Sequence, residues 1–250
     1  MRSFGLIGKS LSHSFSADYF GSRFARDKIV DASYRLFPMP DLSEFRTFVL
    51  SDPSLRGLNV TIPYKEAIIP LLDRLSPEAE AVGAVNTVAI ARKGKEIFLT
   101  GYNTDTYGFD SALSPLLRPQ HTRALVLGTG GASKAVKYVL GQKQIEAAFV
   151  SRTEKPGVFK CYQSLSVADI SHYTLIINTS PVGMAPNANE CPPIPYEGIS
   201  AQHLVFDLIY NPAQTLFLRK ASERGAVAEN GLTMLHLQAD RAWEIWSGLN

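Results

Sequence analysis

A lysine stands where an expected strand turns into an expected helix. The stretch GLNVTIPYK, residues 57–65, alternates Leu58, Val60 and Ile62 with polar residues, which is the period of a half-buried strand. Lys65 would then open a helix running to about residue 75, at the positive end of its macrodipole, where a cation is disfavoured. This placement does not serve helix stability, and it makes Lys65 a candidate for function.

Other polar residues in the first half of the chain follow or flank expected strands. Because ligands bind beyond the carboxyl ends of strands in open α/β sheets, they predict a site for a small polyhydroxylated or carboxylated molecule. Each residue also has a structural role open to it, such as capping a helix or turning the chain. These residues are the serines of 10–16, Thr61, Asn86, Asn103 and Asp105.

A glycine cluster in the second half indicates nucleotide binding. A strand pattern at 123–127 leads into Gly128, Gly130 and Gly131, and a helix pattern follows at once. In dinucleotide-binding folds such glycines let the backbone approach a pyrophosphate at the helix N-terminus. Ser133 occupies the third glycine position of the fingerprint, where a small residue still permits close helix packing. A tight turn that binds nothing is the alternative.

The end of the next strand indicates which nucleotide. An NAD site expects an acidic residue about 20 positions on, to bind the ribose hydroxyls. Here the strand ends in Ser151, Arg152 and Thr153, with Lys155 close behind. Two cations in place of an acid suit a 2′-phosphate, so NADP is favoured over NAD. A solvated charge at a strand end is the alternative.

The elements that would position these residues form two α/β series. Residues 4–103 alternate strand and helix patterns, with helices at 16–27, 41–52 (capped by Asp41), 65–75 and 76–83, and end in a hairpin around RKGK at 92–95. From residue 122 a second series predicts buried parallel strands with intervening helices. A helix at 104–117 separates the two series, and an amphipathic helix ends the chain. We expect an α/β protein of two domains.

Composition limits the classes of function. The net charge is +2, from 25 basic and 23 acidic residues, so neither a nucleic-acid nor a membrane surface is indicated. The five-residue apolar stretch before Lys9 is too short for a signal peptide. Cys161 and Cys191 lack paired spacing, and the histidines and cysteines show no metal-ligand spacing. We expect a reduced, cytoplasmic protein without a metal site, in which His13 and His236 are not catalytic.

Several motifs together resemble the shikimate dehydrogenase family. They occur in the family's order and spacing between about residues 4 and 245. The combination of NVTIPYK, GYNTDTYGF and GLTMLHLQA is highly specific. The motifs are HSFS, NVTIPYK, AVNTV, GYNTDTYGF, GTGGASKA, NTSPVGM, DLIYNP and GLTMLHLQA.

The resemblance implies a reaction and a set of site residues. The reaction is NADP-linked reduction of 3-dehydroshikimate to shikimate, in aromatic amino-acid biosynthesis, with Lys65 and Asp105 as the acid–base pair. The helix dipole and partial desolvation would lower the pKa of Lys65, while Asp105 would orient its ammonium. The implied substrate-binding residues are Ser14, Ser16, Thr61, Asn86, Tyr210 and Gln238. The implied cofactor-binding residues are Gly128, Gly130, Gly131, Ala132, Ser151, Arg152, Thr153, Thr179 and Gly231.

The resemblance also implies domain limits. Residues 1–104, completed by the returning helix 232–250, would bind substrate, and residues 105–231 would form the Rossmann-like NADP-binding domain. The sequence departs from the family at Lys9, Ser10 and Ala17, and in the short segment after Thr153. Two alternatives stay open: a quinate/shikimate dehydrogenase that tolerates NAD, and a non-catalytic NADP-binding regulatory module. Either a monomer or a homodimer is expected.

Overall fold

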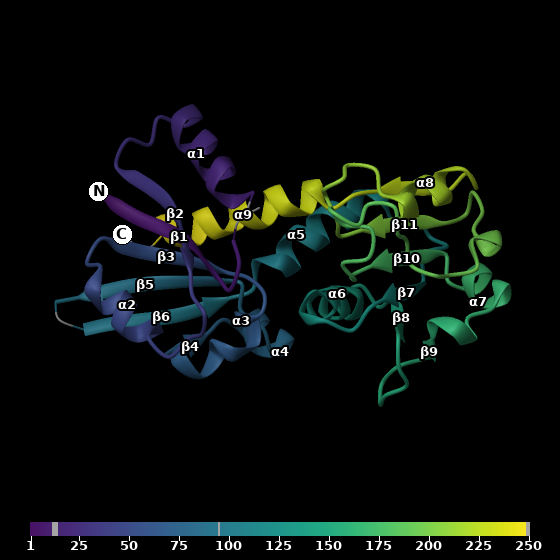
Figure 1. Cartoon of the computed structure of the whole chain (residues 1–250), viewed down its shortest axis with the longest axis horizontal. Helices are drawn as coiled ribbons and strands as arrows, with labels where there is room; N and C mark the ends of the chain where they lie inside the picture. Colours follow the sequence, from purple (N-terminus) through teal and green to yellow (C-terminus); the bar gives the residue numbers. More distant parts are fainter. Residues whose placement is uncertain (12–14, 95, 249–250) are drawn as a thin grey trace. The chain divides into compact units, whose positions relative to one another are not determined.

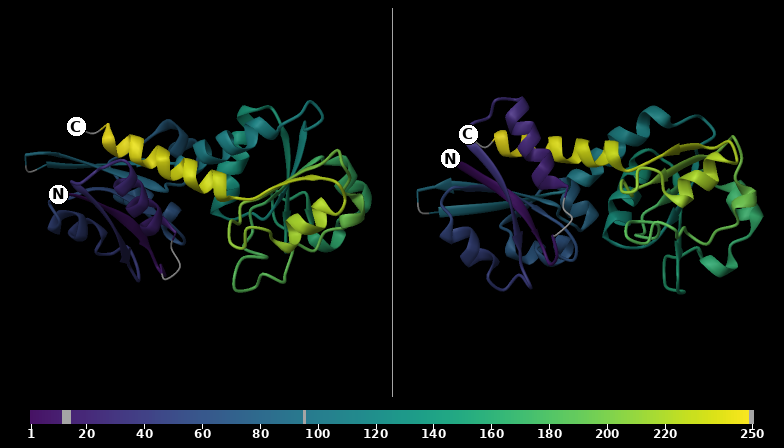
Figure 2. Two further views of the ribbon diagram at one scale, coloured as in Figure 1. Left: turned by 90° about the horizontal axis from the view of Figure 1, so that it is seen from above. Right: turned by 45° about the horizontal axis from the view of Figure 1, so that its top comes forward.

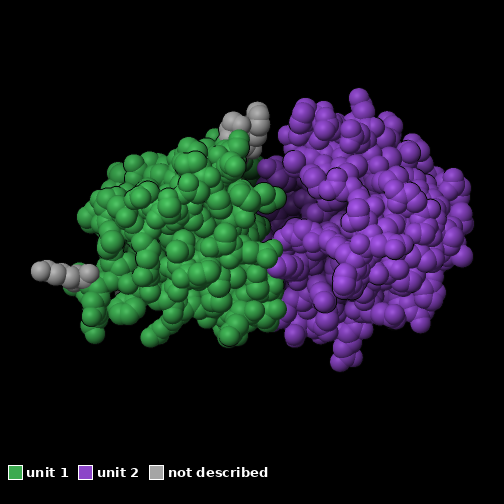
Figure 3. Space-filling view, turned by 60° about the horizontal axis from the view of Figure 1, so that its bottom comes forward, with its two compact units in different colours: residues 1–104, 239–250 green, residues 105–238 purple. Residues whose placement is uncertain are grey.

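The computed structural model describes residues 1–11, 15–94 and 96–248. It divides into two compact units, coloured separately in Figure 3: unit 1, residues 1–104 with 239–250, and unit 2, residues 105–238. Both boundaries fall inside helices, α5 (Thr104–Leu113) and α9 (Leu232–Ser247). Each of these helices therefore contributes residues to both units.

Unit 1 is built on a mixed six-stranded sheet with the order β2-β1-β3-β5-β6-β4. Strand β1 pairs in parallel with β2 and β3, whereas β3, β5 and β6 pair antiparallel. The hairpin expected around RKGK is the β5–β6 pair. The strands are β1 (Arg2–Gly8), β2 (Ala32–Pro38), β3 (Leu55–Val60), β4 (Arg74–Leu75), β5 (Thr87–Lys93) and β6 (Glu96–Tyr102).

Helices cover both faces of this sheet. Along β5, Val88 and Ile90 join the core on the side of α2 (Phe45–Ser51), α3 (Tyr64–Ala67) and α4 (Pro77–Val82). Ala89 points to the other core, shared with α1 (Ser16–Arg26) and the end of α9. Figure 2 shows α9 as one continuous helix (yellow).

The C-terminal part of α9 is fixed in unit 1 by specific contacts. Trp246, 2% exposed, donates its indole Nε1–H to Val88 O at 3.0 Å. A Cβ on Gly57 would lie 2.2 Å from that nitrogen, so only glycine admits the indole here. Asp240, six residues earlier in the same helix, accepts from Tyr19 and forms an ion pair with Arg23.

Three local expectations in unit 1 are wrong. The helix expected at 65–75 is the single turn α3, followed by a 3₁₀ turn, Ile69–Leu71, because Pro70 cannot donate a backbone hydrogen bond. Ile62 lies beyond the end of β3 and is 76% exposed. Asp41 does not cap α2, since it accepts from Ser43 and the helix begins only at Phe45.

Unit 2 contains an all-parallel sheet with the order β12-β11-β10-β7-β8-β9 (Figure 1). Chain order reverses between β7 and β10, which is the switch point where doubly wound sheets bind dinucleotides. The strands are β7 (Arg123–Leu127), β8 (Glu146–Ser151), β9 (Lys160–Cys161), β10 (Leu175–Asn178), β11 (Leu204–Asp207) and β12 (Val227–Glu229).

Both faces of this sheet are also buried. Leu125 and Leu127 of β7 point to the core that includes α7 (Val167–His172) and α8 (Leu216–Ser222). Ala124 and Val126 point to the core formed with α5, α6 (Gly131–Gln142) and the start of α9. The expected two-domain α/β fold is thus confirmed. Short 3₁₀ turns lie at Ser114–Leu116, Tyr162–Ser164 and Tyr196–Gly198.

Within the described ranges, no helix combines the length and apolar character needed to cross a bilayer.

Candidate active site

The glycine loop of unit 2 lies at the switch point of the sheet. Gly128 follows β7 with φ 112°, a conformation that favours glycine, and a Cβ there would lie 2.9 Å from Thr179 Oγ1. Gly130 is the N-cap of α6, and Gly131 is its first residue. A Cβ on either would meet no protein atom within 4 Å. Neither packing nor φ demands glycine at these two positions, which suits close approach of a ligand.

The loop leaves the N-terminus of α6 able to bind an anion. Its N-cap, Gly130, offers no side-chain acceptor to the first amides of the helix. Ser133, in the third position of the fingerprint, donates from Oγ to Gly130 O at 2.6 Å and is only 4% exposed. The serine therefore packs inside the turn. These features fit the pyrophosphate of a dinucleotide, with Ala132 in the same turn.

Next to this loop, β8 ends in the residues expected to choose the cofactor. Ser151 is buried, whereas Arg152 and Thr153 are exposed. Arg152 lies close enough to Tyr162 for its charge to oppose the effect of burial, which raises the pKa of Tyr162 to about 12. The Arg152 guanidinium is thus an exposed cation at the carboxyl end of β8.

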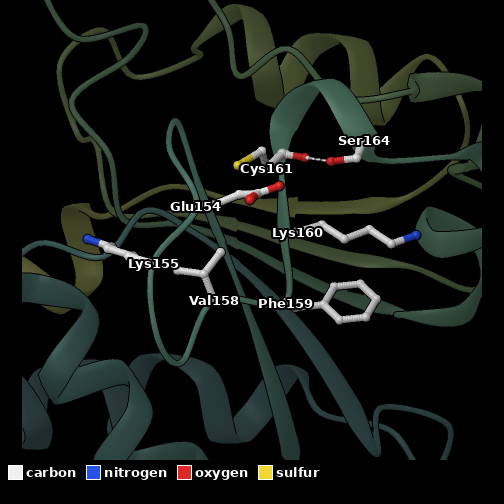
Figure 4. Close-up of a pocket in the computed structure, with 7 residues that line it drawn as sticks. All are labelled: Glu154, Lys155, Val158, Phe159, Lys160, Cys161 and Ser164. Atoms are coloured by element: carbon white, nitrogen blue, oxygen red, sulfur yellow. Dashed lines mark hydrogen bonds between the residues drawn. The ribbon is translucent and has the colours of Figure 1, made fainter.

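A pocket of about 400 Å³ lies beyond this strand end (Figure 4). Lys155 and Lys160 extend in opposite directions from it. Lys160 is held by Asp169 at 2.7 Å, so its charge is engaged. The pocket is lined by Glu154, Lys155, Val158, Phe159, Lys160, Cys161 and Ser164.

On the other side of the switch point, two loops carry further predicted residues. Thr179 follows β10 and donates from Oγ1 to Leu127 O at 3.0 Å. Tyr210 follows β11, and burial raises its pKa. Gly231 lies so close to the loop after β11 that a Cβ on it would be 2.1 Å from Leu208 O. The structure thus places all three at the carboxyl edge of the unit 2 sheet.

Asp105 and Gln238 also belong to unit 2. A Cβ on Gly108 of α5 would lie 2.6 Å from Met234 O and 3.0 Å from Gln238 Cβ, so the two helices are in close contact here. Asp105 is one helical turn before Gly108, on the same face of α5, and is 9% exposed. Gln238 donates to Leu235 O at 3.0 Å. The packing brings Asp105 to the helix face that meets α9.

In unit 1, Lys65 lies in a single turn of helix and not at the start of a long helix. It is the second residue of the four-residue α3 and is partly buried. One turn of helix carries little macrodipole, so the dipole argument for its proton transfer loses its basis. The backbone carbonyl of Lys65 accepts from Val85 N at 2.7 Å. This bond ties the lysine to the segment that precedes β5.

Asn86, next in that segment, holds the start of α5. Its Oδ1 accepts from Thr104 N at 2.7 Å, and its Nδ2 donates to Thr104 Oγ1 at 3.0 Å. Asn103 donates to Ala84 O at 2.9 Å. Lys65 and Thr104, the residue before Asp105, are therefore bound to the successive residues 85 and 86.

The remaining predicted substrate residues also belong to unit 1. Thr61 follows β3, and its amide donates to Ile7 O at 3.0 Å. Ser16 opens α1 and forms a hydrogen bond with Tyr34, whose pKa is raised by burial. Ser14 and His13 lie outside the described residues.

Buried polar residues that sequence reasoning missed support these loops. In unit 1, Asn59 accepts from Tyr34 Oη at 2.8 Å and donates to Thr87 Oγ1 at 3.1 Å, beneath Asn86. In unit 2, Asn178 and Asp207 form a comparable pair. Asn59 and Asn178 each lie in one of the sequence motifs. Their partners, Thr87 and Asp207, become apparent only from the register of the neighbouring strands. Among the described residues, no group of three or more histidine, cysteine or acidic side chains could hold a metal ion.

Comparisons with known proteins agree with this arrangement. The family model for the shikimate dehydrogenase substrate binding domain matches residues 6–88. A Clostridium perfringens (strain SM101) protein named shikimate dehydrogenase (NADP(+)) is 38% identical over 260 residues, covering 100% of this chain and 93% of its own.

Two solved structures are similar over the whole fold. Shikimate 5-dehydrogenase from Thermus thermophilus, in complex with NADP(H) and shikimate, has a TM-score of 0.84 at 31% identity. Quinate dehydrogenase from Corynebacterium glutamicum, in complex with NAD, has a TM-score of 0.87 at 26% identity. Each match covers 99% of this chain and 94% of the other. With its glycine loop and Lys65 segment at strand ends, the chain belongs to the shikimate dehydrogenase family.

Proposed function

We propose that this protein is an NADP-dependent oxidoreductase that reversibly reduces 3-dehydroshikimate to shikimate. The observation that supports it most is that one chain contains both a dinucleotide-type switch point, in unit 2, and the hydrogen-bonded Lys65–Asn86–Thr104 segment, in unit 1. The Clostridium perfringens protein named shikimate dehydrogenase (NADP(+)) is 38% identical over the whole length of this chain. The pathway step would be that of aromatic amino-acid biosynthesis.

The two units divide the work in this proposal. Residues 1–104, completed by the returning helix 232–250, bind the substrate, and residues 105–231 bind NADP. The family model matched by residues 6–88 supports the first assignment. The parallel sheet and its glycine loop support the second.

The cofactor, when bound, supplies a hydride to the C3 carbonyl carbon. The Lys65 ammonium donates a proton to the carbonyl oxygen, so that the ketone becomes an alcohol with one hydride and one proton added. The Asp105 carboxylate orients this ammonium. The tie of Lys65 and Thr104 to residues 85 and 86 supports the pairing.

Hydroxyl and amide groups hold the rest of the substrate. Ser14 and Ser16 bind its carboxylate, and Thr61, Asn86, Tyr210 and Gln238 bind its hydroxyl groups. Because Asn86 Oδ1 accepts from Thr104 N, the orientation of its amide is fixed, and Nδ2 is the atom that donates. Arg152 pairs with the 2′-phosphate of NADP, while Gly128, Gly130, Gly131, Ala132, Ser151, Thr153, Thr179 and Gly231 contact the cofactor.

The test is NADPH oxidation measured with 3-dehydroshikimate. Lys65→Met keeps the apolar stem but removes the proton donor, and it should lower kcat by at least about 10²-fold. Lys143→Met is a matched control, because it removes an ion pair with Asp110 and a hydrogen bond to Ser114, neither of which is a predicted site residue, and it should leave kcat unchanged. Turnover by Lys65→Met at the parental kcat would show that Lys65 only binds.

A second candidate is reduction of dehydroquinate with NADH. Its support is the likeness to the quinate dehydrogenase that was solved with NAD, together with the short segment after Thr153. The same assay with NADH and with dehydroquinate decides between the two. Binding of NADP without turnover of either substrate would indicate the regulatory module instead.

Cellular location and assembly belong to the same proposal. We expect a cytoplasmic protein that acts as a monomer or homodimer and needs no nucleic acid, membrane or metal. Size-exclusion chromatography with light scattering, with and without NADP, measures the assembly. Activity that survives treatment with EDTA would agree with the absence of a metal requirement.

A further inference from the structure

Two buried polar side chains end neighbouring strands of the unit 2 sheet. Asn178 is the last residue of β10 and Asp207 is the last residue of β11, and they are register partners in the parallel pair. Both side chains are 0% exposed. Asn178 donates from Nδ2 to Asp207 Oδ1 at 3.0 Å. They therefore form a cross-strand link at the carboxyl edge.

Asp207 organises the loop that follows β11. Its Oδ1 also accepts from Ile209 N at 3.1 Å, and its Oδ2 accepts from Thr215 Oγ1 at 2.7 Å. Thr215 in turn caps α8 by accepting from Leu218 N at 3.3 Å. The carboxylate thus holds both ends of the 208–215 loop, which carries Tyr210.

Asn178 organises the loop that follows β10. Its Oδ1 accepts from Ser180 N at 3.0 Å and from Ser180 Oγ at 2.7 Å. This fixes the position of Thr179, whose Oγ1 would be 2.9 Å from a Cβ on Gly128. Through Thr179 the link reaches the glycine loop.

The carboxyl group lies in surroundings that do not favour its charge. Burial raises the pKa of Asp207 to about 6, although its three hydrogen bonds lower it. Among the described residues, no cation pairs with the Asp207 carboxyl group. Its charge contributes to raising the pKa of Tyr196, which burial raises most. Asn178, Thr215 and the Ile209 amide, which face it, do not titrate. A neutral residue at position 207 would not carry the desolvation cost of a buried charge. We infer that a carboxylate is present because it accepts three hydrogen bonds at once.

The positions of the 179–182 and 208–215 loops in the sheet indicate which half of the cofactor they border. Arg152 marks the adenosine side of the switch point at the end of β8, and the glycine loop lies at its centre. In a dinucleotide-binding sheet the other half of the cofactor extends over the strands on the opposite side. Here those strands are β10 and β11. The 179–182 and 208–215 loops therefore border the nicotinamide half.

We propose that Asn178 and Asp207 are positioning residues that set these two loops for the nicotinamide half of the cofactor, and that protonation of Asp207 weakens cofactor binding. The proposal rests on the NADP-dependent function above. Neither residue needs to touch the cofactor. A carboxylate accepts three hydrogen bonds, whereas a carboxylic acid directs its own hydrogen towards one of those donors.

Calorimetric titration with NADP⁺ tests the link without requiring turnover. Asn178→Ala removes the bonds to Asp207 and Ser180, and should weaken binding about 10-fold at pH 8. Asp207→Asn keeps Oδ1 facing Asn178 and Ile209 but places an Nδ2 donor opposite Thr215, where protonation would place a hydroxyl. The variant therefore mimics the neutral carboxyl group and should bind about 3-fold more weakly than the parent at pH 8. Should Asn178→Ala fail to fold, Ser180→Ala removes one of the bonds and should weaken binding about 3-fold.

The pH dependence separates a positioning role from a purely structural one. From pH 8 to pH 5 the parent should lose more affinity than Asp207→Asn. Titration of the cofactor's own 2′-phosphate cancels in this comparison, because both proteins bind the same ligand. Equal losses in the two proteins would overturn the role of the carboxyl charge.

His203→Leu is the matched control at the other end of β11. His203 is 3% exposed, accepts from Ser200 N at 3.0 Å and pairs with Ile170 O at 3.0 Å. Its loss should lower the melting temperature but leave NADP⁺ affinity unchanged. Equal weakening by His203→Leu and Asn178→Ala, or parental binding by Asn178→Ala, would overturn the proposal. A parent that binds no NADP⁺ would instead refute the proposed function.

Discussion

Asn86 offers a test in which stability and substrate binding separate. Its Oδ1 accepts from Thr104 N at 2.7 Å, and its Nδ2 donates to Thr104 Oγ1 at 3.0 Å. Asn86 is 3% exposed and Thr104 is 1% exposed, so water cannot replace the lost side chain without rearrangement. Asn86→Ala removes both bonds at the start of α5.

The expected loss follows from these contacts. A buried amide left without its acceptor costs about 1–3 kcal/mol, and the second bond contributes about 1 kcal/mol. The free energy of unfolding should therefore fall by about 2–4 kcal/mol. At this chain length each kcal/mol lowers Tm by about 2–4 °C. Asn86→Ala should melt about 5–15 °C below the parent, and its kcat should fall because Asp105 follows Thr104 directly.

Asn86→Asp separates the two roles of the side chain. An aspartate keeps the acceptor for Thr104 N, and a negative charge is favourable at the start of the ten-residue α5. It loses the Nδ2 donor, so the KM for shikimate should rise about 10-fold. At least half of the Tm lost in Asn86→Ala should return.

Circular dichroism melting and steady-state kinetics at pH 8 measure both effects. A parental Tm in Asn86→Ala would show that this asparagine does not hold α5. A parental KM in Asn86→Asp would show that the amide donor does not face the substrate. Either result would refute the reasoning from the hydrogen-bond pattern.

Three further outcomes are expected. Arg152→Ala should raise the KM for NADP at least about 10-fold and that for NAD little, because the guanidinium pairs with a phosphate; equal losses would contradict the 2′-phosphate assignment. Burial lowers the pKa of His121 below 6.5, and its Nδ1 accepts from Arg118 N at 3.0 Å. As the pH falls, the unfolded chain therefore binds the proton at a higher pH than the folded chain does, and the free energy of unfolding should decrease below about pH 6.5. In a plot of Tm against pH, this decrease should be smaller for His121→Asn than for the parent. Gly57→Ala should lower the free energy of unfolding in urea by about 1–3 kcal/mol, because its Cβ would overlap the Trp246 indole; an unchanged midpoint would show that the indole moves freely.

The strands and glycine turns were predictable because their signals are local. The run ALVL, residues 124–127, is apolar throughout, as expected for a strand buried on both faces, and the glycines follow it directly. The α4 helix was predicted from its start, a Ser N-cap followed by Pro at the first helical position. In the structure Ser76 accepts from Ala79 N, and Gly83, with φ 66°, ends the helix.

The 65–75 helix was predicted wrongly although its sequence contained the contrary signal. Pro70 lies in the middle of the stretch, where it lacks the amide that a helix interior requires. The apolar residues around it suited a helix but equally suit a loop packed on a sheet. Ile68 is fully buried in this way without a long helix.

The buried hydrogen bonds that support the site loops could not be predicted, because the residues they join are far apart in sequence. Asn59 and Thr87 are 28 residues apart, and Asn178 and Asp207 are 29 apart. Each pair occupies opposite positions in the register of neighbouring strands. Neither strand order nor register can be obtained from a single strand's pattern.

The position of α9 has a spectroscopic consequence. Trp243 and Trp246 are the two tryptophans of the chain, and both lie in the core of unit 1 beside Phe4. Intrinsic tryptophan emission therefore follows the unfolding of unit 1 alone, whereas far-ultraviolet dichroism follows the helices of both units. Coincident transitions would mean that the units unfold together, and separated transitions would mean that each loses its structure independently. One native chromophore pair thus allows the cooperativity of the whole chain to be measured without a label.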